Sequence, residues 1–131
     1  MKAILHVQLV VGVENTVYQT EAQQLIEKEF PSVASFGIDN YSSTQMVSYA
    51  LEMVQQTSNV VILVESNSAE ESLGSLVRFF NELSRKKPSH VTFILSGSHQ
   101  VLQRIGQHMK ERFVTETSLT KLKATISSAL A

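Results

Sequence analysis

The stretch from residue 59 to residue 65 constrains the fold more than any other part of the chain. Five apolar residues, Val60 to Val64, stand in a row between Asn59 and Glu65, and a polar segment, 66–72, follows directly. A continuous apolar run rich in β-branched residues is typical of a parallel strand whose sheet carries helices on both faces. We therefore predict a central strand over residues 60–65. Glu65 would then stand at its carboxyl end, where open α/β sheets bind ligands.

The rest of the chain alternates between short apolar segments and segments with helical spacing of apolar residues. The apolar segments at residues 3–11, 33–38, 90–95 and 113–115 predict four more strands, and the second of these suits a sheet edge. Helical spacing predicts helices over about residues 14–30, 42–56, 69–85, 98–113 and 119–130. The predicted N-caps are Asn15, Ser42 or Ser43, and Ser98.

Strand and helix thus alternate five times along the chain. This alternation predicts right-handed crossovers and a parallel sheet, because each helix returns the chain to the start of the next strand. With 131 residues and no long linker, the chain has the size of one domain. We therefore expect residues 1–131 to form a single doubly wound, flavodoxin-like α/β domain with sheet order 2-1-3-4-5.

The composition excludes several classes of protein. Eleven basic and twelve acidic residues leave a net charge of −1, so no positive field would gather nucleic acid or anionic lipid. The absence of cysteine excludes disulfides and thiolate chemistry. No apolar run approaches the roughly 20 residues of a membrane span, and the first residues lack the long apolar region of a signal peptide. We expect a cytoplasmic protein that binds no nucleic acid, membrane, metal or cofactor.

The second half of the chain resembles a response-regulator receiver domain. In that family the apolar third strand ends in the phosphoacceptor aspartate, the fourth ends in Thr or Ser followed by Ala or Gly, and the fifth carries an aromatic residue three positions before a lysine. The corresponding positions here hold Glu65, then Ser96 and Gly97, then Phe113 and Glu116. The resemblance is clearest over residues 59–131, and it implies the flavodoxin-like fold and a role in signalling.

The chain departs from the family at the residues that carry phosphoryl transfer. The first strand ends without the paired Mg²⁺-binding acids, and the nearest acid is Glu14. Glu65 replaces the phosphoacceptor aspartate, Glu116 replaces the lysine, and only Ser96 is kept. Phosphoryl transfer needs a metal ion and a cation to balance the charge of the transferring group. We therefore expect neither Mg²⁺ binding nor the usual phosphorylation.

The resemblance predicts a non-catalytic, phosphorylation-independent regulatory module that acts through protein contacts. In the family, the face formed by the fourth helix, fifth strand and fifth helix commonly makes such contacts, and it corresponds here to about residues 99–130. A homodimer through this face is one expectation. Because glutamate is one methylene longer than aspartate, Glu65 could imitate a phosphoryl charge, engage Ser96 and bias Phe113, the family's switch aromatic. The plainer alternative is that Glu65 only faces water.

A small enzyme or a binding protein for a nucleotide or other phosphorylated ligand is the alternative function. Toll/interleukin-receptor domains and nucleoside deoxyribosyltransferases also place a strand, a polar loop and a helix here, but their pattern, laid on Gly74 and Ser75, puts Arg78 where the catalytic glutamate should stand. A strand-to-helix turn such as residues 96–99 attracts anions through free N–H groups. The residues that we expect in ligand-binding loops are Glu14, Asp39, Ser66, Asn67, Gly97, Ser98 and His99. We expect His6, within the first strand, to have a structural role.

Overall fold

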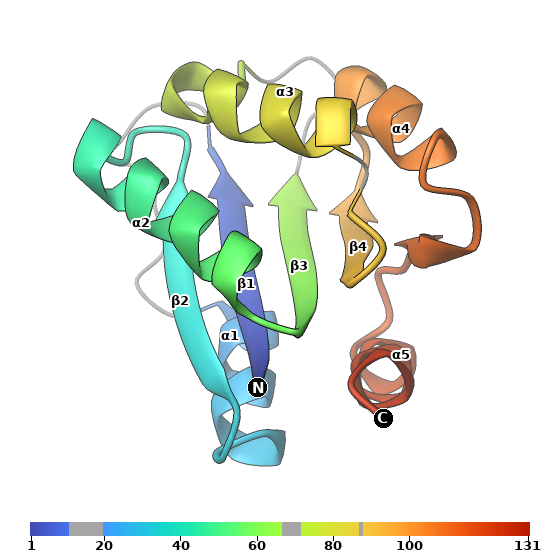
Figure 1. The fold of residues 1–131 in the computed structure, drawn as a ribbon. Coiled ribbons are helices and arrows are strands. Elements are labelled where there is room, and N and C mark those ends of the chain that lie inside the picture. Colours follow the sequence, from blue (N-terminus) through green and yellow to red (C-terminus); the bar gives the residue numbers. More distant parts are fainter. Residues whose placement is uncertain (11–19, 67–71, 87) are drawn as a thin grey trace.

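The computed structural model describes residues 1–10, 20–66, 72–86 and 88–131, apart from the side chain of Glu111. These residues form an α/β fold in which strands and helices alternate along the chain (Figure 1). The strands are β1 (Lys2–Leu9), β2 (Ala34–Asp39), β3 (Asn59–Ser66), β4 (Val91–Gly97) and β5 (Phe113–Thr115). The α-helices are α1 (Glu21–Glu29), α2 (Thr44–Gln56), α3 (Val77–Lys86), α4 (Gln100–Gln107) and α5 (Leu119–Ala129), with 3-10 turns η2 (Gly74–Leu76) and η3 (Lys110–Arg112).

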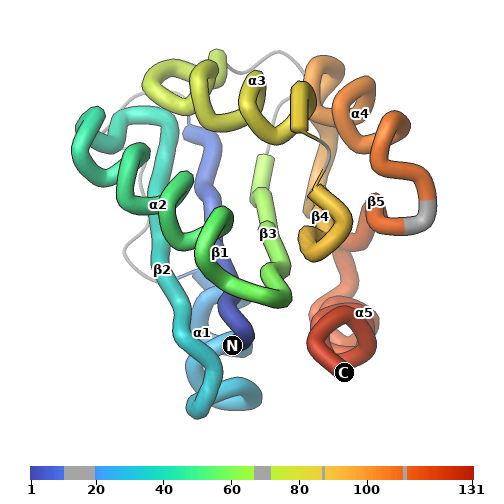
Figure 2. The backbone as a smooth tube through the Cα atoms, viewed as in Figure 1, coloured from blue at the N-terminus to red at the C-terminus, as the bar shows by residue number. Residues whose placement is uncertain are grey.

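The five strands form one parallel sheet in the order β2-β1-β3-β4-β5. Figure 2 shows β3 in the middle of the sheet, with α2, α3 and α4 on one side and α1 and α5 on the other. The predicted strand order and the doubly wound arrangement are therefore confirmed. The central position of β3 explains its sequence, because every residue from Val60 to Val64 is fully buried.

Two apolar clusters hold the helices against the sheet. The larger joins alternate strand residues, such as Ile62 and Phe93, to α2, α3 and α4. The smaller joins the strand residues between them, such as Leu63 and Ile94, to α1 and α5. The three inner strands, β1, β3 and β4, therefore send successive side chains into different clusters, as the period of two in a strand requires.

The strand β2 lies at the edge of the sheet, as predicted. On the side that faces α1 it carries Ser35 and Gly37, which pair in register with Ile4 and His6 of β1. Both edge residues are exposed, and neither has a side chain large enough to pack under the helix. This part of the sheet is therefore only loosely covered by α1.

Two helices begin later than the sequence predicts. Thr20 has an extended backbone (φ −79°, ψ 166°) and caps α1, so no continuous helix reaches residue 21 from residue 14 or 15. Gly74, the first residue of η2, adopts φ +53°, and α3 begins only at Val77. The predicted cap Asn15 and the predicted start at Ala69 lie outside the described residues. The apolar spacing continues past Thr20 and Gly74, which is why the predicted starts of both helices are too early.

The caps of the other helices are partly as predicted. Ser43 caps α2 and accepts a hydrogen bond from the N–H of Met46. At α4 the predicted cap, Ser98, is wrong: His99 holds the cap position, and its Nδ1 accepts from the N–H of Leu102 at 3.3 Å. A buried histidine ring thus replaces the hydroxyl group that the sequence pattern favours.

Candidate functional site

A row of polar residues crosses the α1 and α5 side of the sheet near the carboxyl ends of its strands. Asp39 of β2, Gln8 of β1, Glu65 of β3 and Ser96 of β4 are successive partners in register. Their side chains therefore leave the sheet on the same face. Rows nearer the start of the strands carry apolar residues of the smaller cluster on this face. The polar row marks where the chain could do chemistry.

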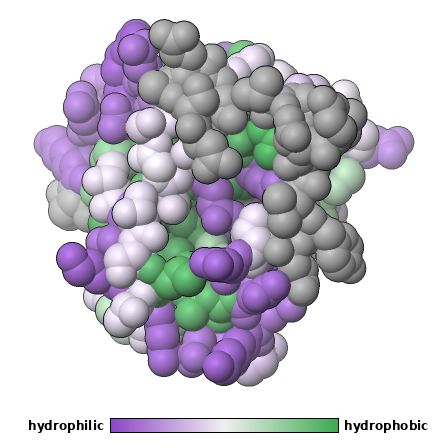
Figure 3. All heavy atoms as spheres, turned by 180° about the vertical axis from the view of Figure 1, so that it is seen from behind, coloured by the Kyte–Doolittle hydropathy of each residue, from purple (hydrophilic) through white to green (hydrophobic). Residues whose placement is uncertain are grey.

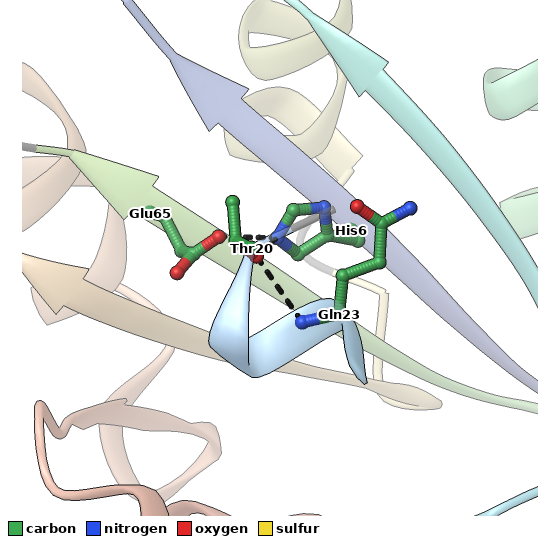
Figure 4. Close-up of polar contacts among 4 residues, drawn as sticks. All are labelled: His6, Thr20, Gln23 and Glu65. Carbon is green, nitrogen blue, oxygen red and sulfur yellow. Dashed lines mark hydrogen bonds and ion pairs between the residues drawn. The ribbon is translucent and has the colours of Figure 1, made fainter. Parts of the chain in front are cut away.

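The closest contact in this region joins His6 to Glu65. The His6 Nε2 atom lies 2.5 Å from Glu65 Oε2, although the two residues are 59 positions apart in sequence (Figure 4). His6 pairs with Leu63, two residues before Glu65, so both side chains project from the same face. The His6 side chain is 5% exposed and that of Glu65 is 24% exposed. A partly exposed carboxylate is therefore fixed by a buried imidazole.

The first turn of α1 completes the cluster. Thr20 Oγ1 accepts a hydrogen bond from the N–H of Gln23 at 3.1 Å and lies 3.5 Å from His6 Nε2. Thr20 also forms a side-chain hydrogen bond with Glu65. The negative charge thus lies beside a helix N-terminus, where the helix dipole favours it. Sequence reasoning missed Thr20 and Gln23, although Thr-x-x-Gln is the pattern of a capping box.

These contacts keep the Glu65 carboxyl group ionised. Burial raises the pKa of Glu65, but hydrogen bonds from His6 and Thr20, together with the charge interaction with His6, lower it by more. The net result is a pKa below the ordinary value of 4.5. Because an ionised carboxylate only accepts hydrogen bonds, we assign the shared proton to His6 Nε2. The other ring nitrogen, Nδ1, takes no part in this hydrogen bond.

A buried amide organises the loops at the carboxyl edge of the sheet. The Asn40 side chain accepts from the N–H of Val10 at 3.0 Å and donates to the carbonyl groups of Val10 at 2.9 Å and Ser72 at 3.1 Å. Its backbone carbonyl accepts from the N–H of Ser75, next to Gly74. A Cβ on Gly74 would lie 2.1 Å from that carbonyl oxygen. Asn40 therefore joins the end of β1 to the segment before α3.

The ends of β3 and β4 are joined in a similar way. Ser66 is 3% exposed and donates to the carbonyl group of Ser98 at 2.9 Å. Gly97 adopts φ +110°, and a Cβ on it would lie 1.8 Å from the carbonyl oxygen of Ser66. The side chain of Ser98 is exposed. These contacts give Ser66 and Gly97 structural roles at the position where the sequence predicted a ligand-binding loop.

The structure brings together only part of the receiver-like constellation. Glu65 and Ser96 are neighbours in register, but the carboxylate bonds to His6 in place of the expected contact with Ser96. Glu116 accepts a hydrogen bond from the N–H of Ser118 at the start of α5, at 3.0 Å.

Phe113 lies on the opposite face of the sheet from Glu65. Its ring packs edge-to-face on Phe93, with centroids 5.3 Å apart, and covers Gly106 of α4. A Cβ on Gly106 would lie 2.3 Å from the Phe113 ring. The ring and the carboxylate that was expected to bias it are therefore separated by the sheet.

The remaining predicted ligand-loop residues do not form one site within the described parts of the chain. Glu14 and Asn67 lie outside the described residues. Asp39 accepts from the N–H of Tyr41 at 2.7 Å within its own turn. His99 caps α4 as described above. Within residues 1–10, 20–66, 72–86 and 88–131, no three His, Asp or Glu side chains are grouped to hold a metal ion.

Comparison with known proteins does not assign the chain to a family. No family model, no curated protein and no solved structure matches it. The helices that the structure describes include none that is long and apolar enough to cross a membrane. The function must therefore be argued from the site itself.

Proposed function

We propose that this chain is a phosphorylation-independent regulatory module of the receiver-like kind, in which Glu65 supplies a permanent negative charge at the end of the central strand. The observation that carries the proposal is the fixed, ionised state of Glu65, held by His6 and Thr20. In a receiver domain this position holds an aspartate, and phosphorylation adds further negative charge beyond that of its carboxylate. A carboxylate that is always ionised would hold this chain in a single regulatory state that phosphorylation does not switch.

The surroundings of Glu65 support a regulatory role over phosphoryl transfer. Its strand neighbours in register are Gln8 and Ser96, which carry no positive charge. The lysine position of the family holds Glu116, which accepts a hydrogen bond from the N–H of Ser118, the N-cap residue of α5. A transferring phosphoryl group would find no lysine or arginine at these positions to balance its charge.

The surface proposed for protein contacts lies within residues 99–130. Val101 and Leu119 are 42% and 37% exposed, whereas Met109 is fully buried in the larger cluster. Figure 3 views the side opposite to that of Figure 1, where hydrophobic patches lie among hydrophilic residues. We propose Leu119, at the start of α5, as a contact residue of a homodimer, because the buried cores of homodimer interfaces are more apolar than the rest of a protein surface.

Sedimentation equilibrium over a wide concentration range tests the homodimer. We expect reversible dimerisation that Leu119→Glu weakens strongly. The matched control is Val77→Glu, because Val77 is a similarly exposed apolar residue on α3, outside residues 99–130. A wild-type chain that stays monomeric throughout, or equal effects of the two substitutions, would contradict this interface.

The role of Glu65 is tested in the same assay with Glu65→Gln, which keeps the size of the side chain and removes its charge. We expect this variant to shift the dimer dissociation constant, while the control Glu52→Gln, on the exposed side of α2, leaves it unchanged. An identical dissociation constant for wild type and Glu65→Gln would remove the support for a charge-based regulatory role.

A further inference from the structure

A small cavity lies between the second half of α2 and the facing side of α3, close to the start of β4. Its volume is about 170 Å³. This is less than the roughly 300–1,000 Å³ of pockets for drug-sized ligands, so the cavity suits a smaller compound. Figure 1 shows α2 and α3 running apart toward their carboxyl ends, which is where the cavity lies. We call it the α2/α3 cavity.

The interior of the α2/α3 cavity is apolar. Val54 of α2 and Phe79 and Leu83 of α3 line it, and all three side chains are buried. Leu51 and Pro88, which are half-buried, complete the apolar wall. Apolar side chains offer water no hydrogen-bond partner, so water gains little by filling such a space. An apolar guest would gain both the burial of its own surface and the contacts that the wall now lacks.

The polar groups around the cavity already have partners within the protein. His90 Nε2 donates to the carbonyl oxygen of Val54 at 2.6 Å, which joins the end of α2 to the start of β4. Glu82 Oε2 lies 3.0 Å from Arg85 Nη2 and 3.6 Å from Lys86 Nζ. Glu82 and Lys86 both line the cavity, so the negative charge at its rim is balanced within α3. The rim therefore favours neither an anion nor a cation.

Volume and lining together select the class of ligand. An apolar cavity of about 150 Å³ lined by leucine, isoleucine and phenylalanine binds benzene. The α2/α3 cavity has a similar volume and a similar apolar lining. Its wall includes the Phe79 ring, which already packs edge-to-face on Phe80 with centroids 5.2 Å apart. Aromatic rings favour such offset and edge-to-face contacts with one another, so an aromatic guest is preferred to an aliphatic one.

We propose that the α2/α3 cavity binds a small uncharged aromatic ligand, a single six-membered ring with at most a short substituent, which packs against Phe79 and Leu83. The site is independent of the regulatory role proposed above. Phe79 and Leu83 belong to the larger apolar cluster, on the face of the sheet opposite to Glu65.

The test compares three probes of similar size: toluene, the N-methylpyridinium ion, which has the shape of toluene and a permanent positive charge, and 1,4-dioxane, a neutral ring with two oxygens. Each is titrated at neutral pH into the full-length chain with ¹³C-labelled methyl groups. For toluene we expect saturable ring-current shifts of the methyl groups of Leu51, Val54 and Leu83. The dissociation constant should be in the millimolar range or below, on the order expected for a ligand of so few atoms. The other two probes should bind at least about tenfold more weakly, because both lose hydration in an apolar cavity.

Two variants test whether toluene occupies this cavity. Leu51→Phe places a larger side chain in the cavity and should weaken toluene binding by about tenfold or more. Its control is Met46→Phe, at an exposed position of α2 that does not line the cavity, and this variant should bind toluene as the wild type does.

Val54→Ile adds only one methylene group and keeps the test decisive if Leu51→Phe does not fold. It should weaken toluene binding while the methyl spectrum stays that of the folded chain. The proposal is overturned if toluene gives no saturable shifts or if N-methylpyridinium or 1,4-dioxane binds equally well. It is also overturned if folded Leu51→Phe or Val54→Ile binds toluene as tightly as Met46→Phe.

Discussion

Substitution of Glu65 tests the His6–Glu65 contact through its effect on stability. Glu65→Gln keeps an oxygen that can accept from His6 Nε2 but converts a charge-assisted hydrogen bond into a neutral one. Charged hydrogen bonds contribute about 1.5–3 kcal/mol and neutral ones about 0.5–1.5 kcal/mol, so we expect a loss of about 1 kcal/mol at neutral pH. Glu65→Ala leaves the buried Nε2–H of His6 without its main acceptor, and we expect a loss of about 2–3 kcal/mol.

The pH dependence of this loss follows from the direction of the pKa shift. The folded-state pKa of Glu65 lies below its unfolded value of 4.5, because the hydrogen bonds from His6 and Thr20 outweigh the effect of burial. The contribution to stability is therefore complete above the unfolded pKa and disappears as the pH falls through the folded pKa. The difference between wild type and Glu65→Gln should be constant from neutral pH down to about pH 5 and should shrink below it.

Urea unfolding at neutral pH and at about pH 3 measures both effects, because the free energy of unfolding extrapolates linearly with denaturant. Glu52→Gln is the control for removing a carboxylate from an exposed position on α2. Equal stability of wild type and Glu65→Gln at neutral pH would refute the reasoning. A difference of the same size at both pH values would also refute it, since the charge could not then be its source.

Three further predictions concern the carboxyl ends of the strands. Asn40→Ala should lower the free energy of unfolding in urea by about 2–4 kcal/mol, because it leaves the buried N–H and carbonyl of Val10 without partners. The control Asn81→Ala, on the exposed side of α3, should lower it by less than about 0.5 kcal/mol. Gly97→Ala should cost more than about 3 kcal/mol, or leave the chain unfolded by circular dichroism, because φ +110° and the nearby Ser66 carbonyl both exclude a Cβ. Addition of Mg²⁺ and then beryllofluoride should leave the amide shifts around Glu65 unchanged; localised shifts would mean that a phosphorylation site persists.

The architecture could be predicted because it depends on periodicities that are local in sequence. The uninterrupted apolar run of β3 indicated burial on both faces, and the structure buries it fully at the centre of the sheet. The weaker apolar pattern of β2 indicated an edge position for the same reason. Once five strands alternate with five helices, the handedness of the crossovers leaves few possible strand orders.

The helix starts could not be placed by periodicity alone. Thr20 and Gly74 each stop helical geometry at one residue, and the apolar spacing continues on both sides of them. The capping pattern Thr20-x-x-Gln23 was a usable signal, and it would have placed the start of α1 correctly. At α4 no common pattern would have chosen His99 as the cap over Ser98, because histidine is rarely found there.

The candidate site was only half predictable. The position of Glu65 at the carboxyl end of β3 follows from the strand alone, and so does the expectation of a structural role for His6. Their contact depends on the register between β1 and β3, which joins residues 59 positions apart. The cavity between α1 and β2, which His6, Gln23 and Ser35 help to line, was not predictable either, because it results from what Ser35 and Gly37 fail to fill.

The ionisation of Glu65 is the central claim, and a pH titration of its side-chain carboxyl carbon by ¹³C NMR measures it directly. The site predicts a midpoint below 4.5, because His6 and Thr20 donate hydrogen bonds to the ionised form. In the His6→Phe variant the titration midpoint of Glu65 should rise. The substitution removes the hydrogen bond that lowers this pKa most, while the burial that raises it remains. A wild-type midpoint at or above 4.5 would contradict the account.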